Sequence, residues 1–258
     1  MSDDRPQDEA ARPSNPALAA ADVVSLGDET RATEIIAQSI LGLWEVVNAL
    51  TRLRPTERGD FRVTIFGSAR IAPEHWVYGA VRDLAAELAR MGCTVVTGGG
   101  PGLMQAANEG AASAGPAAPG RSVGIRVHLP FEQEVNPFVG EVFEHGTFFS
   151  RLHHFVLISD AFVVVPGGVG TVLEMTMVWQ LLQVRKLYRT PLILVGPMWS
   201  ELVDWARRYF LRPEFPLASP SDVDIPRCVD TAQEAIAILR RQHAEWSTSR
   251  RGDGEGNT

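Results

Sequence analysis

The sequence predicts a Rossmann-like α/β fold, a doubly wound and mostly parallel sheet with helices on both faces. From residue 61 onward, short runs of unbroken apolar residues alternate with stretches of helical periodicity. Strands that are apolar throughout are buried on both faces, and strand–helix alternation requires crossover connections that leave neighbouring strands parallel. Glycine-rich turns follow three of the apolar runs, as expected where the strands of such a sheet end.

The expected elements follow from these two patterns in chain order. The apolar runs predict strands at 63–66, 94–97, 123–127, 142–143, 161–165 and 192–195, and a short strand near 227–228. Apolar residues at spacings of three and four predict helices at 75–91, 103–114, 147–159, 171–184, 199–211 and 231–246. In open parallel sheets ligands bind at the carboxyl ends of the strands, so the turns after these strands are where a site is expected.

The chain is expected to have four parts. Residues 1–28 are rich in Asp, Pro, Ala and Ser and predict a flexible tail, and the Gly- and charge-rich residues 247–258 predict a second one. The range 29–59 predicts an amphipathic helix and a linker, and residues 60–246 form the Rossmann-like domain. The helix could cover the core or pack on a second subunit. Its apolar residues are Ile36, Ile40, Leu43, Trp44, Val47 and Leu50.

Composition excludes several classes of function. With 24 basic and 31 acidic residues the net charge is −7, which disfavours general binding of nucleic acid. Two cysteines are too few for a disulfide framework or a cysteine zinc site, and we expect no metal. No stretch of 18 apolar residues predicts a membrane span, and residues 1–15 lack the apolar core of a signal peptide. We therefore expect a cytoplasmic protein.

The three glycine turns predict a phosphate-binding edge. Glycine lets the backbone approach a ligand closely, and the start of the following helix offers free N–H groups to an anion. Tight turns also use glycine without binding anything, so each turn alone is ambiguous. The turns fit neither the dinucleotide fingerprint nor the P-loop pattern. The candidate binding residues are Gly67, Ser68, Gly99, Gly100, Gly102, Met104, Gly167, Gly168, Gly170 and Thr171.

Arg151 and Glu174 are the candidate catalytic pair. Both are expected near the starts of consecutive helices, at the same edge of the sheet. An arginine there can hold a phosphate or stabilise developing charge, and a carboxylate can activate water or stabilise an oxocarbenium-like sugar. The alternative is structural, because Thr171 and Glu174 have the spacing of a helix capping box.

These residues resemble the LOG ("lonely guy") family of nucleoside 5′-monophosphate phosphoribohydrolases, whose members are often mislabelled lysine decarboxylases. Residues 166–174 match the family's Pro-Gly-Gly-x-Gly-Thr-x-x-Glu motif in full, and Arg151 stands nine residues before Asp160, as the family's arginine does. Segments 66–70, 98–104 and 129–133 also resemble the longer bacterial members. The likeness covers roughly residues 60–212.

The resemblance implies hydrolysis of the N-glycosidic bond of a nucleotide such as AMP or an N6-modified AMP, as in cytokinin biosynthesis. It implies no cofactor, usually a homodimer, a catalytic role for Arg151 and Glu174, and a 5′-phosphate held at Gly167, Gly168, Gly170 and Thr171. One position departs from the family, because Leu152 replaces the lysine that usually follows the arginine. This departure favours the alternative of a non-catalytic protein that binds or carries a nucleotide or a phosphate-bearing cofactor.

Other candidates have weaker patterns. His153 and His154 are adjacent, so a helix points them to different faces, and they do not fit a metal pair. The segment 129–137, which includes Asn136, could form a wall over the pocket or a surface crossover. Lys186 is the only lysine and therefore the only candidate for a Schiff base, and nothing around it indicates a pyridoxal phosphate site.

Overall fold

The computed structural model describes residues 30, 31, 33, 34, 59–115, 120–127, 135–187 and 190–254, with side chains up to residue 249. The predicted tail 1–28, most of the range 29–59 and residues 129–134 of the expected pocket wall lie outside the described residues. Within 29–59, Thr30, Arg31, Thr33 and Glu34 are helical and exposed. The chain divides into two units, Met1–Thr56 and Glu57–Thr258, and the second contains the site.

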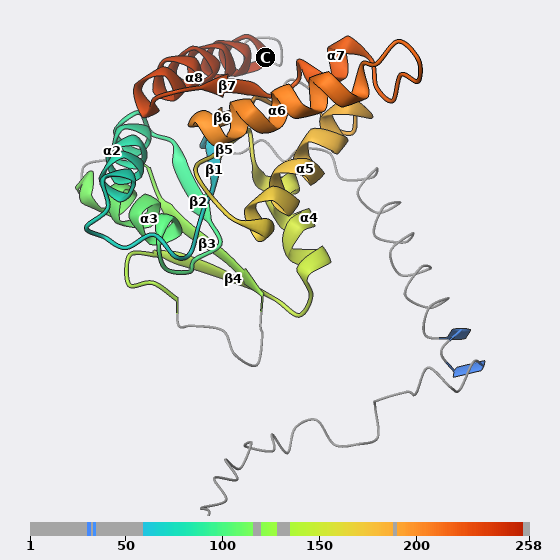
Figure 1. Cartoon of the computed structure of the whole chain (residues 1–258). Coiled ribbons are helices and arrows are strands. Elements are labelled where there is room, and N and C mark those ends of the chain that lie inside the picture. Colours follow the sequence, from blue (N-terminus) through green and yellow to red (C-terminus); the bar gives the residue numbers. More distant parts are fainter. Residues whose placement is uncertain are drawn as a thin grey trace, which may run out of the picture. The chain divides into compact units, whose positions relative to one another are not determined.

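A seven-stranded parallel sheet in the order β4-β3-β2-β1-β5-β6-β7 forms the centre of the second unit (Figure 1). The predicted fold class is thereby confirmed. Three of its inner strands are short runs of Val, Ile, Leu, Phe, Ala and Thr that are buried on both faces. The strands are β1 (Arg62–Phe66), β2 (Thr94–Thr97), β3 (Ser122–Val127), β4 (Glu141–His145), β5 (Ala161–Val164), β6 (Leu192–Val195) and β7 (Arg227–Val229).

Strand order reverses beside β1. This strand pairs with β2 on one side, in the register Val63↔Val95, and with β5 on the other, in the register Val63↔Ala161. From β1 the chain proceeds outward to β4, then returns to β5 and proceeds outward the other way. The connections that follow β1 and β5 therefore lead to opposite sides of the sheet, and an open α/β sheet forms its ligand crevice at the carboxyl edge where this happens.

Helices cover both faces of the sheet. Alternate strand residues point to opposite faces, so Val63 and Ile65 pack with α2, α3 and α8, while Phe162 and Val164 pack with α4, α5 and α6. The long helices are α2 (Trp76–Arg90), α3 (Leu103–Ser113), α4 (Phe148–Ile158), α5 (Val169–Gln183), α6 (Pro197–Phe210) and α8 (Ala232–Gly254). No described helix has an apolar stretch of the length needed to cross a membrane.

Helix ends account for most differences from the prediction. A short helix, α7 (Pro220–Val223), was not predicted; Ser219 and Asp222 form a capping box at its start. Helix α6 begins two residues early because Pro197 occupies its first turn, where no N–H is needed. Helix α5 begins at Val169 rather than at residue 171.

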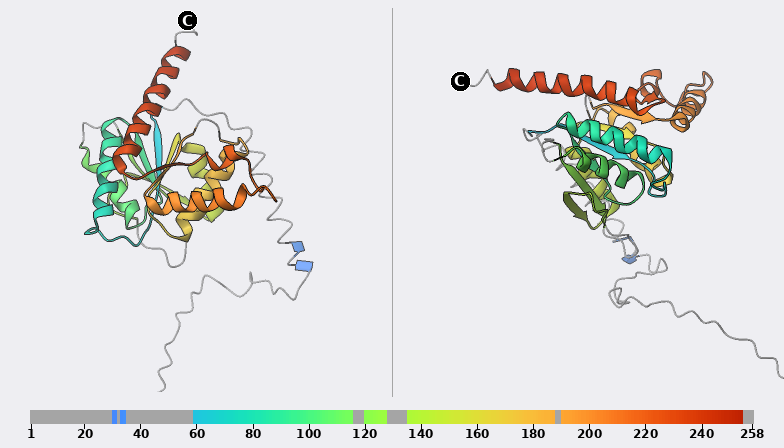
Figure 2. Two further views of the ribbon diagram at one scale, coloured as in Figure 1. Left: turned by 45° about the horizontal axis from the view of Figure 1, so that its top comes forward. Right: turned by 90° about the vertical axis from the view of Figure 1, so that its left-hand side faces the viewer.

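Helix α8 continues to Gly254, eight residues beyond the predicted end at Trp246, and projects past the rest of the domain (Figure 2). Composition suggested that the helix stops before this segment. Instead, the hydroxyls of Ser247 and Thr248 donate to the carbonyls of His243 and Ala244, so the polar side chains bond along the helix. The boundary drawn at residue 246 is therefore too early for the helix itself.

Candidate active site

The turns after β1, β2 and β5 are bonded to one another at the carboxyl edge. The backbone N–H of Ser68, after β1, donates to the carbonyl of Pro166, after β5, at 3.0 Å. The carbonyl of Ser68 in turn accepts from the N–H of Leu103, at the start of α3, at 2.8 Å. The three predicted glycine turns therefore form one continuous backbone surface.

Gly102 is the point of closest approach between the turns. Its φ of +66° is disfavoured for other residues, and a β-carbon there would collide with the carbonyl oxygen of Ser68. Gly67 is enclosed as well, because a β-carbon on it would lie 2.5 Å from Val165. The hydroxyl of Ser68 accepts from the N–H of Arg70 at 3.0 Å. The contacts described for Gly67, Ser68 and Gly102 are thus contacts within and between the turns, which hold the turns in shape.

A buried polar network holds the turn after β2. Asn108 on α3 is fully buried; its Oδ1 accepts from the hydroxyl of Thr97 at 2.7 Å and from Nδ2 of Asn136 at 3.0 Å. Asn136 also donates to the carbonyls of Gly99 and Gly100, at 3.0 and 2.9 Å. Of the predicted pocket wall at 129–137, Asn136 therefore anchors the glycine turn.

Arg151 and Glu174 meet in space, as the topology predicted. Nη2 of Arg151 on α4 lies 3.4 Å from Oε1 of Glu174 on α5, and the two side chains are 14% and 12% exposed. Nε of Arg151 donates to the carbonyl of Ile125 on β3 at 2.9 Å, which fixes the guanidinium over the end of the sheet. A guanidinium group and a carboxyl group are thus held together where little water reaches them.

Burial raises the pKa of Glu174 to about 7, and the nearby positive charge of Arg151 opposes that rise. A carboxyl group with a pKa near neutrality can both accept and give up a proton at physiological pH. Carboxyls tuned in this way are typical of catalytic positions.

The capping-box alternative for Glu174 is wrong. Helix α5 begins at Val169 with Gly168 as its N-cap and no side-chain capping bond, so Glu174 lies in the second turn. Its carboxylate faces Arg151 instead of the start of its own helix. The reason is that helix α5 begins at Val169, two residues earlier than the sequence pattern predicts.

Gly98 and Met104 line the space around Arg151. A β-carbon on Gly98 would collide with Nη2 of Arg151 and lie 2.7 Å from Sδ of Met104. Cε of Met104 packs over Gly100 in the same way. Met104 was predicted as a binding residue, whereas Gly98 was passed over although it lies in the same glycine run.

The turn after β5 is open to solvent. Gly168 and Gly170 are exposed, and nothing lies within 4 Å of a β-carbon placed on either one. Thr171 is buried at 5% exposure, and its side chain occupies the space beside the Cα of Gly167. The exposed start of α5 thus presents backbone N–H groups where an anion can approach.

Leu152 is a buried residue of α4. Its side chain is 7% exposed, and it stands directly after Arg151 on α4. The position at which the family usually has lysine is therefore an apolar, buried one in this chain.

Sequence reasoning assigned no role to Asn108 or His145, and it gave Asn136 only a place in the candidate pocket wall 129–137. Asn108 carries a signal that could have been found, since an asparagine on the buried face of an Ala-rich helix needs a polar partner. Asn136 and His145 have no such signal, because their partners lie on other elements. His145 ends β4, and its Nε2 lies 2.8 Å from Nδ1 of His154 on α4.

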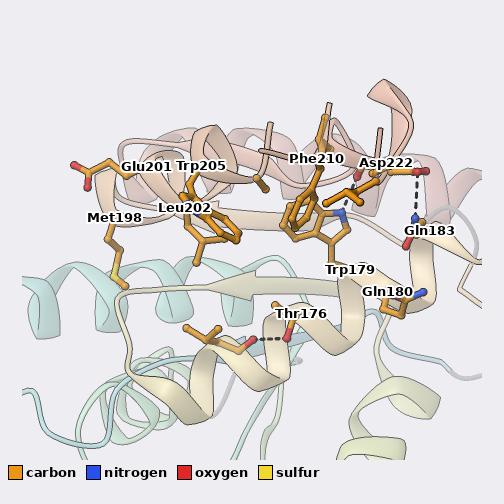
Figure 3. A pocket seen from close by; sticks show the side chains of 15 residues that line it. Thr176, Trp179, Gln180, Gln183, Met198, Glu201, Leu202, Trp205, Phe210 and Asp222 are labelled. Atoms are coloured by element: carbon orange, nitrogen blue, oxygen red, sulfur yellow. Dashed lines mark hydrogen bonds between the residues drawn. The ribbon is translucent and has the colours of Figure 1, made fainter. Parts of the chain in front are cut away.

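A separate groove of about 740 Å³ lies between α5, α6 and α7 (Figure 3). Trp179 and Trp205 line it together with other apolar side chains, and Nε1 of Trp179 donates to the carbonyl of Asp222 at 2.6 Å. None of the predicted site residues lines this groove. Val172 and Thr176, which do, flank Glu174 in the sequence of α5.

Comparison with known proteins shows the family of the chain. The sequence profile of the family described as "Possible lysine decarboxylase" matches residues 104–239. That match covers more than half of the chain and includes Arg151 and the motif that ends at Glu174. The chain belongs to this family. It is the LOG family that the motifs resemble, and its label of lysine decarboxylase is a misnomer.

The curated relatives of this LOG-family chain are nucleotide-cleaving enzymes. The pyrimidine/purine nucleotide 5′-monophosphate nucleosidase of Escherichia coli K12 is 31% identical over 152 residues, and a protein of the same name from strain O157:H7 matches equally well. The aligned stretch covers 56% of this chain but 32% of the relative, so it spans about a third of those enzymes.

Solved structures share the fold at lower identity. The molybdenum cofactor carrier protein of Chlamydomonas reinhardtii is 19% identical with a TM-score of 0.53, covering 72% of this chain and 99% of that one. The molybdenum cofactor binding protein of Rippkaea orientalis is 18% identical with a TM-score of 0.54, covering 72% and 98%. These likenesses show a common architecture.

Proposed function

We propose that this LOG-family protein hydrolyses the N-glycosidic bond of a nucleoside 5′-monophosphate, releasing the free base and ribose 5-phosphate. The observation that carries the proposal is the buried Glu174, held 3.4 Å from Arg151 beside three bonded glycine turns. The name of the Escherichia coli relatives supports the same reaction class. AMP and N6-modified AMP are the first substrates to test.

The proposed roles follow from the chemistry of each group. The open turn at Gly167, Gly168 and Gly170, with the start of α5, holds the 5′-phosphate. Ionised Glu174 takes a proton from the water that attacks C1′, and it stabilises the positive charge that develops on the sugar as the bond to the base breaks. Arg151 holds the Glu174 carboxylate in place and contributes a positive charge next to the phosphate-bearing sugar.

The lysine decarboxylase label has no support in the described residues. Lys186, the only lysine in the sequence, follows the last turn of α5, at the far end of that 15-residue helix from the glycine turn. The helix rises about 14 Å from Glu174 to its end at Gln183, so Lys186, beyond that end, is remote from Glu174.

Chromatography after incubation with nucleotides tests the proposal. The purified protein is incubated with AMP, GMP, CMP, UMP and an N6-modified AMP, and free base is quantified. We expect release by the native protein and a loss of about 10²–10⁴-fold in kcat for Glu174→Gln. That variant also controls for contaminating nucleosidases. A folded native protein that releases no base from any of them would overturn the proposal.

The buried Leu152 favours one second candidate, a protein that binds a nucleotide or phosphate-bearing cofactor without turning it over. Without a lysine at that position the site has one fewer positive charge for a phosphate. Tight binding of AMP in calorimetry together with no base release would select this candidate.

We also propose that the protein works as a homodimer in the cytoplasm. Both α5 and α6 carry exposed apolar side chains: Leu173 on α5 is 52% exposed, and Trp205 on α6, which lines the groove of Figure 3, is 53% exposed. Such an unpartnered apolar surface is typical of an interface. Sedimentation velocity tests this: we expect a dimer that Trp205→Glu converts to a monomer, and a monomeric native protein would contradict it.

A further inference from the structure

His145 and His154 form a hydrogen-bonded pair beside Arg151. His145 is the last residue of the edge strand β4, and its Nε2 lies 2.8 Å from Nδ1 of His154. His154 follows Arg151 by three residues on α4, so the two share a helix face. The pair therefore stands at the same carboxyl edge as the glycine turns.

Packing fixes the pair from both elements. The ring of His154 meets Phe143 of β4 edge-on at a centroid distance of 4.7 Å, and the two imidazoles lie 5.0 Å apart. Both histidines are half-buried. In the described part of the chain, no third His, Cys, Asp or Glu joins them in a group that could hold a metal ion.

Strand order places the pair on the far side of Arg151 from the phosphate turn. The turn at Gly167–Thr171 follows β5, Arg151 is anchored on β3 through Ile125, and His145 ends β4. These groups lie in a row along the edge of the sheet. A nucleotide with its 5′-phosphate at the β5 turn and its sugar at Glu174, beside Arg151, can extend its base in the direction of β4.

We propose that the His145–His154 pair is the general acid that protonates the departing base; this rests on the proposed function. As the C1′–N bond breaks, its electron pair moves to the base, which takes a proton from His145. Water attacks C1′ and gives its proton to Glu174. The products are the neutral base and ribose 5-phosphate, and exchange with solvent returns a proton from Glu174 to the pair.

The N–H···N bond sets how many protons the pair can hold. One shared proton lies between Nε2 of His145 and Nδ1 of His154, and a single additional proton leaves both outer nitrogens protonated with the bond intact. A further proton would break the bond. The singly charged pair can therefore release a proton from Nδ1 of His145 without losing its geometry.

The surroundings make His145 a stronger acid. Burial lowers the pKa of His145, and the positive charge of Arg151 lowers it further. Glu144, its neighbour in β4, points to the other face of the strand and pairs with Arg126 of β3 at 3.7 Å. The charge of Arg151 thus acts on His145 and favours proton transfer to the base.

A leaving group that needs no proton provides the test. The native protein, His145→Gln and the control His153→Gln are compared on AMP and on 4-nitrophenyl ribofuranoside 5-phosphate, whose nitrophenolate departs unprotonated. His153 lies beside His154 but is bonded to the carbonyl of Phe149, at 3.1 Å. We expect His145→Gln to lose about 10²–10⁴-fold in kcat on AMP and less than about tenfold on the nitrophenyl substrate. His153→Gln should match the native protein on both.

The pH profile of the native protein keeps the test decisive if His145→Gln does not fold. We expect kcat on AMP to fall as pH rises through the pKa of His145, which burial and Arg151 hold below the ordinary value for histidine, and this alkaline limb to be absent with the nitrophenyl substrate. Equal losses on both substrates in His145→Gln, or an alkaline limb with both, would overturn the general-acid role alone. Release of neither base nor nitrophenol by the native protein would overturn the proposed function as well.

Discussion

Nη2 of Arg151 lies 3.4 Å from Oε1 of Glu174, and the same nitrogen occupies the space that a β-carbon on Gly98 would need. The turn after β2 thus limits where the guanidinium can lie, and the guanidinium limits where the carboxylate lies. This three-way contact joins β2, α4 and α5.

Gly98→Ala tests that contact. The added methyl group would displace Arg151 and press on Met104, so we expect kcat for base release to fall more than tenfold with little change in melting temperature. Gly79→Ala on α2 is the matched control, because nothing lies within 4 Å of a β-carbon placed at Gly79. It should leave activity unchanged and stabilise the helix by about 0.5–1 kcal/mol. Full activity in Gly98→Ala would show that the position of Arg151 is not critical.

The raised pKa of Glu174 predicts a pH-dependent stability. Burial raises its pKa from 4.5 to about 7, so the folded state binds this proton more tightly than the unfolded state does. The contribution is present below about pH 4.5 and is lost as pH rises through 7. Urea unfolding at pH 5 and pH 8 should show the native protein losing up to about 3 kcal/mol relative to Glu174→Gln. Parallel changes in the two proteins would mean that Glu174 has an ordinary pKa.

The buried network around Asn108 predicts a large cost for removing its amide. Asn108→Leu leaves Thr97, Ser122 and Asn136 without their shared partner, and we expect the free energy of unfolding to fall by about 3 kcal/mol. The exposed Thr176 is the control, since Thr176→Val should change stability by less than about 0.5 kcal/mol. Chemical denaturation measures both. A near-neutral Asn108→Leu would show that the network contributes little to the fold.

Burial of Leu152 predicts that restoring the family's lysine is costly. Leu152→Lys places an ammonium group at a position that is 7% exposed and next to Arg151 in the sequence, so we expect a loss of about 2 kcal/mol or more and no gain in base release. Leu157 on the same helix is 37% exposed, and Leu157→Lys should be tolerated. Calorimetric melting and the base-release assay measure the two effects. Higher activity in Leu152→Lys would instead identify a missing phosphate contact.

The sequence by itself determined the strands and the turns between them. β2 and β6 have the bounds that their apolar runs predicted, because strands buried on both faces carry no polar interruption. The spacing between Arg151 and Glu174 also sufficed to bring them together, since consecutive βα units in a parallel sheet start their helices at one edge. These are consequences of local pattern and of a topology with few alternatives.

Only the tertiary structure decided which side chains meet across elements. The sequence offered a capping box at Thr171 and Glu174, but the entry of the chain into α5 at Val169 turned Glu174 toward Arg151. Likewise, Asn136 reaches Asn108, and His145 reaches His154, through packing of separate elements. Periodicity indicates which face of an element is buried, whereas the partner of a buried polar group depends on how the elements pack against one another.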